Sequence, residues 1–94
     1  MEVVLDMLGS SRGLPQEQED ARLLAEMIEQ RAPRVVPDRK PISLVWGARS
    51  THTLQLEEKG QPIRREVPRD LAQDLIASPD NKGLWARLDL ILRS

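Results

Sequence analysis

The chain has 94 residues and a net charge of −1, is 39% hydrophobic and 31% charged, and contains no cysteine. This balance is typical of one soluble globular domain, which we expect to span residues 1–94, and it argues against disorder. Without cysteine the chain has neither disulfides nor thiolate chemistry. Because it also lacks a signal-peptide pattern and a membrane-spanning apolar run, we expect a cytoplasmic protein.

The N-terminal part of the chain contains the clearest helical pattern. Glu2 to Leu8 fits either a strand beside the sheet or a short helix, and Gly9 to Gly13 is predicted to be a loop. From Gln16 to Ala32, alanine, leucine and isoleucine recur at helical spacing. Acidic side chains in the first turns and a basic one in the last complement the helix dipole. We expect Pro33 to end this helix.

The middle of the chain predicts three strands. The segment APRVVPDRKP, residues 32–41, has three prolines and is expected to be an extended connector. Apolar and polar residues then alternate with a period of two along 42–46 and 51–57. Gly47 suits the first turn and Lys59-Gly60 the second, because glycine reaches positive φ without steric cost. A third strand near Ile63 to Val67 stops at Pro68 and completes an antiparallel meander.

The C-terminal part predicts one or two helices. Pro68 suits the first turn of a helix, and the segment after it places apolar residues on one face. The tail from Leu84 to Leu92 fits a helix and a strand equally well by spacing. We expect a helix, because Ser78-Pro79-Asp80 is a favourable helix start. The expected fold is therefore α+β: an N-terminal helix, a three-stranded antiparallel β-meander and one or two C-terminal helices on one sheet face.

The sequence contains no set of residues that converges on catalysis. Its only histidine, His52, shares a strand face with Leu54 and Leu56, so we expect an imidazole at the edge of the core that bonds to backbone. No carboxylate is placed to orient it as in a catalytic triad. Metal-binding, phosphate-loop and dinucleotide motifs are absent from the sequence. We therefore expect no enzyme, no metal, no cofactor and no small-molecule substrate.

Charge is distributed unevenly along the chain. Residues 1–30 hold two basic and seven acidic side chains, whereas residues 31–69 hold nine basic and four acidic ones. The basic stretch, residues 31–69, would suit phosphates or an acidic protein partner, since arginine binds phosphate and carboxylate alike. The alternative is that the acidic first helix lies beside the basic sheet and the charges satisfy each other within the fold.

Two classes of function fit these observations. The first is a small, non-catalytic interaction module, such as an adaptor, chaperone-like or regulatory subunit, that docks on a protein partner or forms a homodimer. The tail favours it, because Ala86 and Leu90 lie off the main apolar stripe and would need a second neighbour. The second is a nucleic-acid-binding module. The candidate partner-binding residues are Arg49, Arg64, Arg65, Arg69, Ala86 and Leu90.

Overall fold

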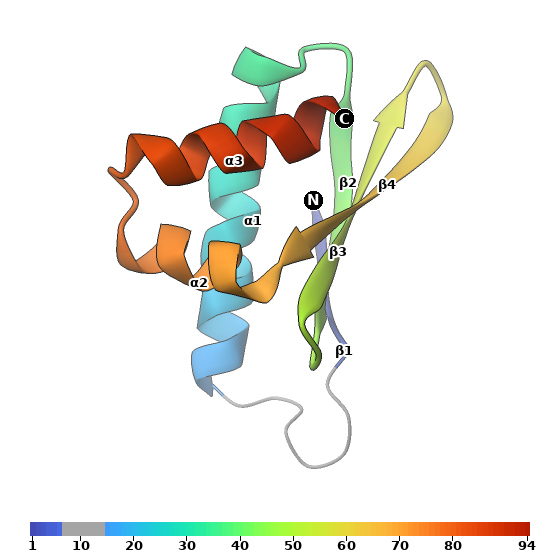
Figure 1. Ribbon diagram of the computed structural model, residues 1–94. Helices are drawn as coiled ribbons and strands as arrows, with labels where there is room; N and C mark the ends of the chain where they lie inside the picture. The colour runs from blue at the N-terminus through green and yellow to red at the C-terminus, as the bar shows by residue number, and fades with distance from the viewer. Residues whose placement is uncertain (7–14) are drawn as a thin grey trace.

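The structure, a computed structural model, describes residues 1–6 and 15–94, which form one mixed four-stranded sheet with three helices on one of its faces (Figure 1). In chain order the elements are β1 (Glu2–Asp6), α1 (Pro15–Val35), β2 (Lys40–Gly47), β3 (Thr51–Glu58), β4 (Gln61–Pro68), α2 (Arg69–Ala77) and α3 (Lys82–Arg93). The loop expected at Gly9 to Gly13 lies outside the described residues. No described helix is both long and apolar enough to cross a membrane.

The sheet has the strand order β1-β2-β3-β4. The antiparallel meander β2–β4 is confirmed, and its second turn uses Lys59 and Gly60, whose φ angles are 53° and 79°. However, β1 adds a fourth strand parallel to β2, with Glu2 paired to Ser43. The expected sheet of three antiparallel strands is therefore wrong in strand number and in the direction of its edge strand. Of the two options left open for Glu2 to Leu8, the strand beside the sheet is confirmed over Glu2–Asp6. The parallel direction follows from α1, which carries the chain back to the end of the sheet where β1 began.

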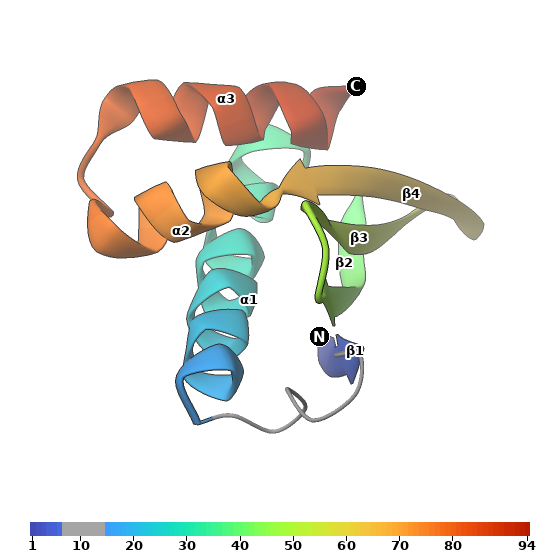
Figure 2. The same cartoon turned by 60° about the horizontal axis from the view of Figure 1, so that its bottom comes forward.

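The two faces of the sheet differ in character because successive side chains along a strand point to opposite sides. Leu44, Leu54 and Val67 face the helices and are fully buried. Thr53 and Glu66 pair across the opposite face, and Figure 2 shows all the helices on the other side of the sheet. Within the described residues, no helix or strand covers this second face.

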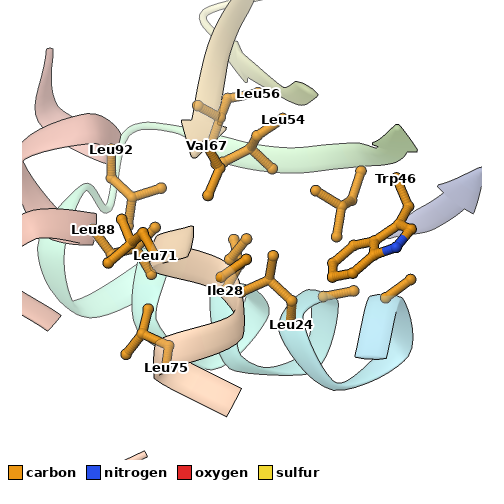
Figure 3. Packing of buried hydrophobic residues seen from close by; sticks show 14 residues of the cluster. Leu24, Ile28, Trp46, Leu54, Leu56, Val67, Leu71, Leu75, Leu88 and Leu92 are labelled. Carbon is orange, nitrogen blue, oxygen red and sulfur yellow. The ribbon is translucent and has the colours of Figure 1, made fainter. Parts of the chain in front are cut away.

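The core lies between the sheet and the helices and is aliphatic around one indole ring (Figure 3). Trp46 is the largest fully buried side chain. Among the described residues, the other buried apolar ones are Ala21, Leu24, Ala25, Ile28, Ala32, Leu44, Leu54, Leu56, Val67, Leu71, Ala72, Leu75, Leu88 and Leu92. Every element except β1 contributes to this set, and β1 adds the partly buried Leu5, which packs against it.

The first helix is longer than expected. We expected Pro33 to end it, but α1 continues through Pro33 to Val35. A proline in the last turn removes only one intrahelical hydrogen bond. The buried Ala32 fixes this turn in the core, and the Val36 N–H donates to its carbonyl oxygen at 2.8 Å. The proline-rich connector expected at residues 32–41 is reduced to residues 36–39, because β2 also begins earlier than expected, at Lys40.

The C-terminal tail is a helix, which confirms the expected choice between helix and strand. Its start differs from the expectation, because the cap is Asn81 and not Ser78. The Asn81 Oδ1 accepts a hydrogen bond from the Leu84 N–H at 3.2 Å, which satisfies one of the free donors of the first turn. Residues 78–81 form the turn that reverses the chain between α2 and α3.

Candidate interaction surface

Four arginines of the basic stretch are bound by other groups of the same chain. The Arg31 guanidinium donates twice to the Asp89 carboxylate, at 2.9 and 2.7 Å. The other three are Arg39, Arg65 and Arg69. Of the four, only Arg69 pairs with an acid of α1. Much of the positive charge seen in the sequence is therefore bound by acceptors within the fold. Most of these acceptors lie outside the acidic first helix.

Arg69 holds the β2–β3 turn against the first helix. Its guanidinium donates to the carbonyl oxygens of Arg49, at 2.6 Å, and Gly47. It also lies 5.9 Å from the centre of the Trp46 ring and 3.9 Å from the Glu17 carboxylate, which accepts a hydrogen bond from the Trp46 indole N–H. Arg69 is thus a structural residue, and only 19% of its side chain is exposed.

Arg39 and Arg65 bind the C-terminal end of α3. The last carbonyls of a helix have no intrahelical partner and carry partial negative charge. Arg39 donates to the carbonyl oxygens of Leu92 and Ser94, both at 2.7 Å, and pairs with Glu58 at 2.9 Å. Arg65 Nε donates to the same Ser94 oxygen at 2.9 Å. The two arginines therefore connect the sheet to the end of α3.

Arg64 and Arg49 are the exposed members of the predicted arginine set. Arg64 is paired with Gln55 across the sheet and so points to the face without helices, whereas Arg65 is paired with Leu54 and points to the helices. Arg49 lies on the β2–β3 turn and borders a hollow of about 360 Å³ together with Asp6. Arg49 and Arg69 are neighbours, but the structure does not bring the six predicted residues into one surface patch.

Reversing the charge of Arg65 should destabilise the fold, and reversing that of Arg64 should not. Arg65→Glu removes the hydrogen bonds to Ser94 and is expected to lower the free energy of unfolding by about 1–2 kcal/mol. Arg64→Glu is expected to stay within about 0.5 kcal/mol of the unchanged protein. Urea denaturation followed by circular dichroism measures both. Equal stability losses would contradict the assignment of the two side chains to opposite faces.

His52 is a core residue. The expected bond to backbone is present, since the Gly47 N–H donates to Nδ1 at 3.1 Å. The expected position at the edge of the core is wrong: His52 is fully buried and stacks on Trp46 with 3.7 Å between ring centres. Burial, assisted by the positive charge of Arg69, lowers the pKa of His52 from 6.5 to about 4. The imidazole is therefore neutral at physiological pH.

The outer side of α3 exposes Ala86 and Leu90, as the tail pattern indicated. Leu90 is 67% exposed, the highest value among the large hydrophobic side chains of the described residues. Its helix neighbours Leu88 and Leu92 are fully buried. Ala86 lies one turn before Leu90, so the two share a stripe of the exposed surface.

A second region was missed in the sequence. Met27, Gln30, Arg31 and Arg34 follow one another on one side of α1 and border, with Pro79 and Trp85, a groove of about 330 Å³. Their spacing of three and four residues was visible in the sequence. What the sequence could not show is that the chain segment around Pro79 forms the opposite wall.

Comparison with known proteins assigns neither a family nor a function to the chain. The chain matches no family model, no curated protein and no solved structure. In the part of the chain that the structure describes, no three or more histidine, cysteine, aspartate or glutamate side chains gather where a metal ion could bind. The surfaces of α1 and α3 and the arginines are therefore the features of the chain that bear on its function.

Proposed function

We propose that this domain is a small, non-catalytic interaction module that docks on a protein partner through the outer side of α3. The observation that supports the proposal is the exposed leucine at position 90 in a helix whose other leucines pack inward. A single exposed leucine is common on protein surfaces. Here it shares its stripe with Ala86, so the two present adjoining apolar contacts that a partner would cover.

The charges around this stripe favour an acidic partner over a second copy of the chain. Arg87 and Arg93 are exposed on the same helix. The only acid of α3, Asp89, is bound to Arg31 and nearly buried. Two copies that paired through α3 would bring like charges together, which costs free energy. A homodimer through this surface is thus the less favourable form of the proposal.

Leu90→Glu should weaken docking at least tenfold, because it removes a leucine contact worth about 1.5–3 kcal/mol and places a charge in the interface. The matched control is Gln73→Glu, which adds the same charge at an exposed position of α2. Immobilised wild-type and variant chains are compared for the proteins that they retain from extract with and without nuclease treatment. Analytical ultracentrifugation of the same variants measures self-association.

A partner retained equally by wild type, Leu90→Glu and Gln73→Glu would contradict docking through α3. A mass increase with concentration that Leu90→Glu abolishes would identify the partner as a second copy. Retention that disappears after nuclease treatment and falls steeply with salt would favour the alternative, a nucleic-acid-binding module. We rank that alternative second, because Arg65 and Arg69 already have acceptors within the fold.

A further inference from the structure

The groove between α1 and α3 combines apolar walls with a cationic rim. Trp85, Met27 and Pro79 provide the apolar walls. Trp85 is held in place, because its indole N–H donates to the Pro79 carbonyl oxygen at 2.6 Å. Its ring also lies 5.2 Å from the Arg31 guanidinium carbon, in a cation–π contact. The positions of Trp85 and Arg31 in the groove are therefore fixed by contacts within the fold.

The rim of this groove carries hydrogen-bond donors that have no partner among the described residues. Arg31 uses Nε and Nη2 for Asp89, and its Nη1 has no partner among the described residues. The guanidinium of Arg34 is exposed and has no hydrogen bond or ion pair with any residue that the structure describes. Gln30 adds an exposed amide. Since Asp89 offsets the charge of Arg31, Arg34 supplies the net positive charge of the lining.

We propose that this groove binds an acidic peptide segment in which an apolar side chain of leucine size lies next to a carboxylate. The apolar side chain enters between Trp85 and Met27, and the carboxylate accepts hydrogen bonds from Arg34 and Arg31 Nη1. A guanidinium is well suited to this, because its planar donors match the two carboxylate oxygens. The Asp89 carboxylate does not oppose binding strongly, since its oxygens are already engaged by Arg31.

The size of the groove favours a peptide over a small molecule. At about 330 Å³ it is at the lower end of the range for small-molecule pockets, which bury most of their ligand. Gln30, Arg34 and Pro79 on its rim are exposed, so a longer chain would gain contacts outside the groove. The proposal involves neither Ala86 nor Leu90, and the two proposals therefore stand or fail separately.

The two tryptophans make the test direct. An amide proton–nitrogen spectrum of the 94-residue chain contains one indole signal each from Trp46 and Trp85. The probe is an acetylated and amidated peptide with two leucines between pairs of glutamates. Titration should shift the Trp85 signal and leave that of the fully buried Trp46 in place. Peptides with serines for the leucines, or with lysines for the glutamates, should bind at least tenfold more weakly.

Arg34→Ala should weaken binding of the acidic peptide about tenfold, the usual size of losing one charge-assisted hydrogen bond. Arg22→Ala, which removes an exposed arginine of α1 that does not line the groove, is the control and should bind as wild type. Arg34→Glu should reverse the preference toward the lysine peptide. An unchanged Trp46 signal shows that each variant is folded. The proposal is overturned if Trp85 does not respond to the acidic peptide, if Arg34→Ala binds like wild type, or if the lysine peptide binds the wild-type chain equally well.

Discussion

Replacing Leu88 by alanine is expected to lower the free energy of unfolding by about 2–5 kcal/mol, whereas the same change at Leu90 should alter it by less than about 0.5 kcal/mol. Leu88 is fully buried, and Figure 3 shows it beside Leu71. Truncation there removes apolar contacts and leaves a cavity. Leu90 has few contacts to lose. Urea denaturation followed by circular dichroism measures both values.

This pair of variants also tests the conformation of the tail. In a helix, Leu88 and Leu90 are about 200° apart around the axis, whereas in a strand they would share one face. Leu92→Ala is the matched control, because Leu92 is buried on the same side as Leu88. It should cost as much as Leu88→Ala. Equal losses at Leu88 and Leu90 would contradict the helical assignment.

Acid should destabilise the protein between pH 6.5 and pH 4 through His52. The folded pKa of about 4 lies below the ordinary value of 6.5, so the unfolded chain binds a proton that the folded chain excludes. The stability contribution is fully present above pH 6.5 and is lost as the pH falls toward 4. The shift corresponds to about 3 kcal/mol. Urea denaturation at several pH values across this window measures the loss.

His52→Phe provides the control, because phenylalanine keeps a ring against Trp46 and does not titrate. The variant loses the acceptor for the Gly47 N–H, so its free energy of unfolding differs from that of wild type at every pH. However, the change of this free energy between pH 6.5 and 4.5 should nearly vanish. Asp89 does not interfere in this range. The hydrogen bonds from Arg31 lower the pKa of that carboxyl below 3.8, so it titrates at more acidic pH. If the free energy of unfolding of His52→Phe still falls with pH over this range, the acid sensitivity belongs to other groups.

The sequence predicted those elements whose signals are local. The meander follows from alternation along residues 42–46 and 51–57 together with Lys59-Gly60, and α1 follows from its apolar stripe. In contrast, β1 has three adjacent apolar residues between two acidic ones, with no alternation. Its pairing partner is decided by the path of α1 and could not be inferred from EVVLD itself.

The candidate surfaces were predicted only in part, because tertiary packing decides which side chains contact one another. Arg31 and Asp89 are 58 residues apart in sequence, and nothing near either one indicates the other. Similarly, the strand neighbours of His52 do not reveal that it stacks on Trp46 from the preceding strand. The exposure of Leu90 and Ala86 could be inferred, since it depends only on the angular position of each residue around one helix.

The parallel pairing of β1 also bears on the order in which the chain assembles. The strands β2, β3 and β4 are joined by short turns and can pair as soon as those turns close. By contrast, Glu2 meets Ser43 only after the whole of α1 has folded back across the sheet. Closing so long a connection costs more chain entropy than closing a hairpin. We therefore expect β1 to be the last strand to join the sheet and the first to leave it.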